Sequence, residues 1–176
     1  VSEVTKEGGY FIGTSYDGQK IFNMLKNIPE NESKVIMDTD HSTGDKKIIW
    51  ELTKRYSNEE LNDDESCLGY SIDVYQESIN KTIREYLVNY TYLTRILENY
   101  GFVLVGDEEL KKLNSKITSG TGMFNDLFKQ MNDEIKNKTN SRAFSYDKAQ
   151  FMSDGERTIS FLNRYFIYKK VRKVSN

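Results

Sequence analysis

The chain has 176 residues, of which 25 are basic and 27 acidic, so its net charge is −2. That length is typical of one domain, and the nearly neutral charge argues against a protein that coats nucleic acid by bulk charge. We expect neither a membrane span nor a secretory signal peptide, since no apolar run approaches the roughly 20 residues of a span. A single cysteine, Cys67, and a single histidine, His41, predict a reducing compartment without disulfides and argue against a Cys/His zinc site or a Ser-His-Asp triad.

The N-terminal segment follows the rhythm of an α/β protein. Residues 1–5 are predicted to end a helix, and Gly8-Gly9 to turn the chain. The apolar run Tyr10–Ile12 is typical of a strand buried on both faces, and Asp17 stands where a residue caps the next helix. Pro29 falls where that helix should stop. Helix, turn, strand and helix in this order indicate a doubly wound α/β sheet.

Residues 33–75 change to a period of two and predict an antiparallel β insertion. Apolar and polar positions alternate there, as in Trp50 and Leu52, which are separated by Glu51. The candidate strands are 33–40, 46–56 and 66–76.

Residues 1–32 and 76–176 are predicted to form the sheet-and-helix core around this insertion. The later elements are, in order, a helix at 89–101, a strand at 102–105, helices and loops over 107–138, a polar loop at 137–148, a helix at 154–162 and a closing strand at 164–172.

Two glycine motifs are near-misses to nucleotide-binding loops. Gly13, Gly18 and Lys20 in "GTSYDGQK" are spaced almost as in a phosphate-binding loop, but the lysine does not directly follow the second glycine. An ordinary strand-to-helix turn is favoured. Gly120 and Gly122 in "SGTGMF" lack the preceding strand and third glycine of a dinucleotide fingerprint, so we expect a flexible loop.

One group of residues has metal-ligand chemistry. Asp38, Asp40 and His41 in "DTDHSTGDKK" could hold a metal, but the same stretch is typical of a solvated hairpin loop. We favour the loop and predict no metal site.

Glu85 lies between Arg84 and Tyr86 in "REYLV", directly before an apolar pair. Its carboxylate could form an ion pair with Arg84 or face solvent. The functional alternative is a carboxylate that faces a base, because guanine presents two parallel donors, its ring N–H and its exocyclic amine. A site built on such paired hydrogen bonds rejects analogues that lack them.

The closing strand combines aromatic and basic residues. Alternation puts Tyr165 and Ile167 on one face and Phe166 and Tyr168 on the other. One tyrosine is expected in the core, whereas the other could stack on a base or meet a phosphate. The basic residues that follow could attract RNA or simply be solvated; they are Lys169, Lys170, Arg172 and Lys173.

Three segments together, at 4–18, 68–105 and 152–170, resemble the mRNA cap guanine-N7 methyltransferases. The resemblance is strongest to the version that is fused to capping enzymes of poxviruses and other large cytoplasmic DNA viruses. Each segment alone is modest evidence, but the three occur in the family's order and with similar spacing. The resemblance covers nearly the whole chain and is weakest at 30–65 and 107–150.

The resemblance implies the C-terminal part of a Rossmann-like methyltransferase that depends on S-adenosylmethionine (SAM). Gly9–Thr14 would be the fifth strand of its sheet, and 47–75 would help to wall the cap pocket. Residues 102–105 and 164–171 would be the last, antiparallel strand pair. The family's SAM-binding half is expected upstream of Val1, so we expect this part to be inactive alone.

The resemblance also implies site residues. Glu85, in the "EYLV" motif, would hydrogen-bond the cap guanine, and Tyr165, which opens the final aromatic strand, would contact the cap. Tyr16 stands where many cellular members have proline, so its contact with the base is a weaker expectation. No catalytic base is predicted, because guanine N7 has a lone pair and no proton, and its methylation needs in-line positioning.

The implied partner is 5′-capped RNA, with fused triphosphatase and guanylyltransferase domains and an activating subunit as further expectations. The implied location is the cytoplasm, in a viral factory or virion, or the nucleus for a cellular protein. Two other readings stay open. One is a non-catalytic, methyltransferase-like regulatory or interaction module, and the other is a generic α/β enzyme with a degenerate phosphate loop at 13–20.

Overall fold

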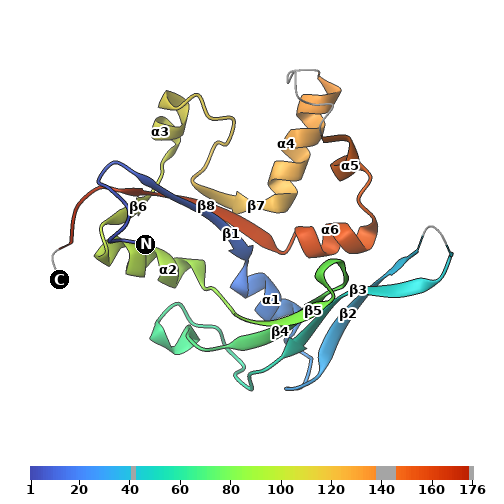
Figure 1. The fold of residues 1–176 in the computed structure, drawn as a ribbon. Coiled ribbons are helices and arrows are strands. Elements are labelled where there is room, and N and C mark those ends of the chain that lie inside the picture. Colours follow the sequence, from blue (N-terminus) through green and yellow to red (C-terminus); the bar gives the residue numbers. More distant parts are fainter. Residues whose placement is uncertain (41–42, 138–145, 175–176) are drawn as a thin grey trace.

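The computed structural model describes residues 1–40, 43–137 and 146–174, which contain two antiparallel sheets with helices packed around them (Figure 1). In sheet A, the closing strand β8 (Asn163–Lys170) is central. Strand β1 (Tyr10–Tyr16) pairs along one edge of β8, and β6 (Phe102–Leu104) and β7 (Thr121–Met123) pair with the other.

All strand pairs in the described residues are antiparallel, so the mixed α/β fold does not contain the expected doubly wound parallel sheet there. Strands β1 and β6 do run in the same direction, but β8 lies between them and runs the opposite way. The predicted antiparallel pairing of the last two strands is present, as β6 with β8.

Strand β1 forms as predicted, but its burial on both faces is wrong. The side chain of Ile12 is 66% exposed, whereas Phe11, on the other face of the strand, packs against Phe166. The predicted N-terminal helix end is a single turn, in which the Thr5 N–H donates to the Val1 carbonyl at 3.1 Å.

Helix α1 (Gly18–Met24) begins where its cap was predicted. The side chain of Asp17 accepts a hydrogen bond from the Lys20 backbone N–H at 2.9 Å, which satisfies one of the free donors of the first turn. Ile21 and Leu25, which are fully buried, turn the apolar face of this helix toward the second sheet.

Sheet B is the predicted antiparallel insertion, and it extends beyond residue 75. Its order is β2 (Ser33–Thr39), β3 (Lys46–Lys54), β4 (Ser71–Gln76) and β5 (Lys81–Tyr86). Sequence patterning missed β5 because Ile83 is its one aliphatic residue.

The main core lies between sheet B and α1, where Trp50 and Leu52 are fully buried. A second cluster lies under helix α2 (Tyr90–Asn99), where Leu97 packs with Phe102 and Phe166. The remaining helical elements are η1 (Glu65–Cys67), η2 (Glu77–Ile79), α3 (Asp107–Lys112), α4 (Phe124–Lys136), α5 (Asp147–Gln150) and α6 (Asp154–Ser160). No helix in the described ranges has the length and apolar character that crossing a bilayer requires.

Two loop predictions have different outcomes. The "SGTGMF" stretch is not a flexible loop, because Thr121–Met123 pairs with β8, and Gly122 leaves room for the ring of Tyr165. Most of the loop predicted at 137–148 lies outside the described residues, and so does His41.

Candidate functional site

Tyr16, the last residue of β1, joins the two sheets. Its Oη accepts a hydrogen bond from Trp50 Nε1 at 3.1 Å and another from Gln76 Nε2 at 3.2 Å. Trp50 lies on β3 and Gln76 on β4, directly opposite each other in register, so both side chains leave sheet B from the same face. The ring of Tyr16 packs edge-on against the indole, with 6.1 Å between centroids.

Glu85 projects from the same face of sheet B. It pairs in register with Ile72, which is two positions along β4 from Val74 and four from Gln76, so all four side chains share the covered face. The carboxylate of Glu85 makes no hydrogen bond or ion pair with any described residue, and burial raises its pKa.

The ion pair that sequence reasoning allowed between Glu85 and Arg84 is not formed. Adjacent residues of a strand point to opposite faces, and Arg84 binds Asp73 on the outer face of sheet B. Arg84 Nε lies 2.7 Å from Asp73 Oδ1, and Arg55 Nε lies 2.7 Å from Oδ2. With Arg84 committed elsewhere, Glu85 is a partly buried carboxylate that could accept donors from a ligand.

Glu85 lies close enough to Tyr16 for its charge to affect the ionisation of the phenol. Burial raises the pKa of Tyr16, the hydrogen bonds from Trp50 and Gln76 lower it, and the negative charge of Glu85 raises it. The structure therefore brings together two of the three predicted guanine-binding residues, which lie 69 positions apart (85 − 16).

Tyr165, the third predicted residue, lies on the same face of sheet A as Tyr16. In the β1–β8 register Tyr165 is opposite Thr14, and Tyr16 is opposite Asn163, so one residue pair lies between the two tyrosines. Tyr165 is only 9% exposed, and its Oη donates to the Ser119 carbonyl at 3.2 Å. Little of this residue is therefore open to a base.

The other tyrosine of the closing strand, Tyr168, belongs to the core, as expected for one of the two. It is 1% exposed, and its hydroxyl shares a hydrogen bond of 2.8 Å with Thr94 of α2. Of the basic residues that follow it, Lys169 binds Glu109, and Lys170 donates to the Tyr100 carbonyl at 2.8 Å. These two cations have protein partners and are not free for RNA.

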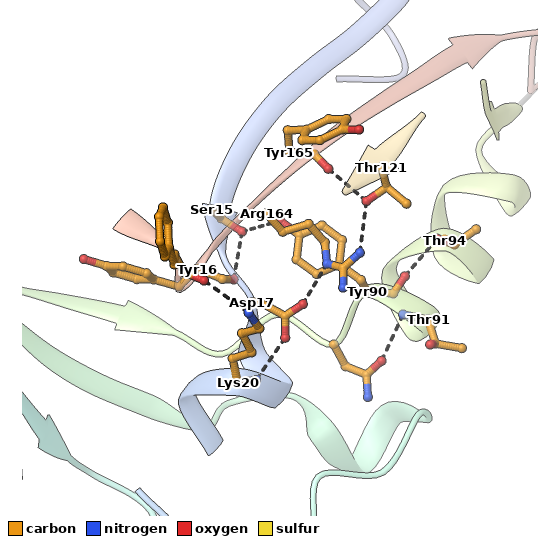
Figure 2. Close-up of polar contacts among 12 residues, drawn as sticks. Ser15, Tyr16, Asp17, Lys20, Tyr90, Thr91, Thr94, Thr121, Arg164 and Tyr165 are labelled. Carbon is orange, nitrogen blue, oxygen red and sulfur yellow. Dashed lines mark hydrogen bonds and ion pairs between the residues drawn. The ribbon is translucent and has the colours of Figure 1, made fainter. Parts of the chain in front are cut away.

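A polar network fixes the ends of β1 and β8 beside the site (Figure 2). Arg164 Nε binds Asp17 Oδ2 at 2.7 Å, and the other oxygen of this buried carboxylate caps α1. Arg164 Nη1 also donates to Thr121 Oγ1, which donates to the Tyr165 carbonyl at 2.8 Å. Sequence reasoning assigned Asp17 as a cap but missed Arg164, which lies 147 positions away.

Trp50 and Gln76 also line a pocket of ≈ 610 Å³ between sheet B and α6, a volume typical of small-molecule sites. Lys47 lies in this pocket with Asp40 at 3.7 Å and Glu77 at 3.2 Å. This concave space adjoins the two residues that hold the Tyr16 hydroxyl, whereas Tyr16 and Glu85 themselves do not line it.

The other motifs bring no site together among the described residues, and His41 lies outside them. The segment 13–20 contains the end of β1 and the start of α1, with no loop to surround a phosphate, and Lys20 Nζ donates to the Phe161 carbonyl. The stretch containing Asp38 forms the predicted β2–β3 hairpin. Among the described residues, His, Cys, Asp and Glu side chains do not gather in threes as metal ligands would.

Comparison with known proteins gives one informative similarity. No family model matches the sequence. Over 194 aligned residues, which cover 99% of this chain, it is 28% identical to a probable mRNA-capping enzyme of Acanthamoeba polyphaga mimivirus. The chain spans 15% of the length of that protein. The similarity relates the chain to mRNA-capping enzymes through one part of a much longer protein.

Proposed function

We propose that the chain is part of an mRNA cap guanine-N7 methyltransferase and supplies the side of the site that binds the cap guanine. The observation that carries the proposal is Glu85, a partly buried carboxylate without a protein partner, placed beside Tyr16 at the junction of the sheets. Its place in the "EYLV" motif is the one that the family resemblance implies. Similarity to a viral capping enzyme supports the proposal.

The topology of sheet A supports the same proposal. Antiparallel β8 lies between β1 and β6, which run in one direction, as expected for the last strands of a Rossmann-like methyltransferase. The outer edge of β1 has no partner strand in the described residues, so further parallel strands could add there. We therefore infer that sheet A is the last part of a Rossmann-like methyltransferase sheet.

Methylation of N7 requires this chain to orient the guanine and does not require it to supply an acid or a base. The Glu85 carboxylate would accept the ring N–H and the exocyclic amine of guanine, which fixes the base in its plane and leaves N7 free. Positioning of this kind can supply much of the rate, since N7 has no proton to remove. SAM would supply the methyl group, and none of the described side chains is assigned to binding it.

The test uses the chain together with the residues that precede it in its natural protein, and measures methylation of capped RNA. Glu85→Gln keeps the shape but replaces an acceptor-only group, and we expect cap affinity to fall by roughly 10- to 100-fold, as for loss of hydrogen bonds to a charged group. Glu51→Gln, on the opposite face of sheet B, is the matched control and should change little.

Unchanged cap affinity in Glu85→Gln would overturn the proposal. Cap binding without methyl transfer in the wild type would instead favour the non-catalytic module. The fused capping domains, an activating subunit and a cytoplasmic location stay predictions.

A further inference from the structure

The hydroxyl of Tyr16 has a fixed hydrogen-bonding polarity. A phenol has one proton to donate and two lone pairs that accept. The indole of Trp50 can only donate, and the Gln76 amide nitrogen also donates, so both lone pairs of Tyr16 are occupied. Its proton has no acceptor among the described residues, and so Tyr16 remains a donor for a ligand.

Glu85 presents the opposite polarity. When ionised, its carboxylate can only accept, and it has no donor partner in the described part of the chain. It leaves sheet B from the face that carries Trp50 and Gln76, the two residues that hold Tyr16. The junction of the sheets therefore offers one donor, which two hydrogen bonds hold in place, and one acceptor.

This arrangement matches guanine and is inverted for adenine. Guanine has a keto oxygen, O6, beside the N1–H and the 2-amino group, whereas adenine has an amino group beside a bare N1. We propose that Tyr16 donates to guanine O6 and that Trp50 and Gln76 are positioning residues that fix its proton outward, so that the site selects guanine. This inference rests on the proposed function and adds a specificity determinant to it.

The selection would be strong because both mismatches would fall on groups that the protein already shields partly from water. Adenine would set its amino group against the Tyr16 proton and its N1 lone pair against the Glu85 carboxylate. Burying a polar group without a partner costs more free energy than a good hydrogen bond contributes. A site of fixed polarity therefore discriminates between bases better than an apolar pocket does.

The experiment measures the affinity of the full chain for three cap dinucleotides. One carries guanine, the second carries 6-thioguanine, which keeps the N1–H and the 2-amino group but has sulfur, a weaker acceptor, in place of O6, and the third carries hypoxanthine, which lacks the 2-amino group. We expect the wild type to prefer guanine over 6-thioguanine by roughly tenfold, the worth of one partly buried hydrogen bond. Tyr16→Phe should reduce this ratio to within about twofold and keep the preference over hypoxanthine, because Glu85 is intact.

Gln76→Glu tests the positioning role. A carboxylate at this position accepts the Tyr16 proton, so the preference for O6 should also be lost. Tyr75→Phe, which removes a hydroxyl from the opposite face of β4, is the control and should keep the wild-type ratios.

Each ratio compares two ligands on one variant, so it does not depend on the folded fraction. If Tyr16→Phe is too unstable to assay, Gln76→Glu alone decides. Full preference for guanine over 6-thioguanine in the assayed variant overturns the inference. If the wild type binds none of the dinucleotides, or Glu85→Gln binds them as well as the wild type does, the proposed function fails as well.

Discussion

Three carboxylates, those of Asp17, Asp73 and Glu85, have different environments in this protein. Asp17 is buried, caps α1 and binds Arg164, so both of its oxygens have partners. Asp73 is buried between Arg55 and Arg84. Glu85 is partly buried and has no partner in the described residues, although unpaired charge disfavours folding. An unpaired charge that lowers stability in this way suggests that the residue has a binding role.

This difference predicts that Glu85→Gln stabilises the free protein at neutral pH. Burial raises the folded-state pKa of Glu85 above its unfolded value, so the wild type loses stability as pH rises through that range. Glutamine carries no charge, so the variant does not lose stability as the pH rises. Thermal or urea unfolding should show nearly equal stability at pH 4 and a more stable variant at pH 7. A variant that is less stable at pH 7 would contradict the assignment.

Asp73 predicts the opposite pH dependence. Hydrogen bonds from Arg84 and then Arg55 lower its pKa from 3.8 to about 2. The stabilisation is therefore full above pH 4 and disappears as pH falls toward 2. Asp73→Asn should lower the free energy of unfolding at pH 7 by about 1–2 kcal/mol, discounted for partly exposed arginines, with a gap that closes in acid.

Asp63→Asn is the control for Asp73. It removes an exposed ion pair with Arg95, whose atoms lie 3.4 Å apart, and exposed pairs contribute at most about 1 kcal/mol. An equal loss in both variants would show that the buried position of Asp73 adds nothing.

Among the elements, those with strong periodicity were predictable and those defined by pairing were not. Alternation identified β3, and a capping residue with an apolar stripe identified α1. Strand β5 has too few apolar residues to show a period, and β7 has three residues, one of them a glycine. Both strands form because they pair with the edge of a neighbouring strand, β4 for β5 and β8 for β7. Such pairing depends on the tertiary structure and leaves no local pattern in the sequence.

At the level of elements, the close approach of α1 to the β5–α2 connection can be tested. The Gly18 N–H donates to the Val88 carbonyl at 3.0 Å, and a Cβ on Gly18 would lie 2.4 Å from that oxygen. Gly18→Ala should lower the free energy of unfolding by about 2–3 kcal/mol, because backbone cannot move aside as a flexible side chain can.

Gly106→Ala is its control, since Gly106 has open space around the Cβ position and a negative φ of −86° at the N-cap of α3. We expect its loss to stay within about 1 kcal/mol in chemical denaturation. Equal losses for the two alanines would mean that the contact with Val88 is not tight.

At the level of the whole molecule, the candidate site is an assembly of distant segments. The resemblance named Glu85, Tyr165 and Tyr16, but only the fold shows that Trp50 and Gln76 hold the Tyr16 hydroxyl. These residues come from different sheets, and no local pattern records such a contact. The absence of an Arg84–Glu85 pair likewise needed the strand register, which the sequence left open.

The central place of β8 also determines when sheet A can form during synthesis. In the described residues β1, β6 and β7 have β8 as their one partner, and Tyr10 pairs with Lys169. The ribosome therefore releases three of the four strands before their common partner exists. Until then the aromatic face of β1 is exposed, while sheet B, whose strands are all adjacent in sequence, can already close. Newborn chains would thus pass through a stage in which one half is folded and the other needs protection from aggregation.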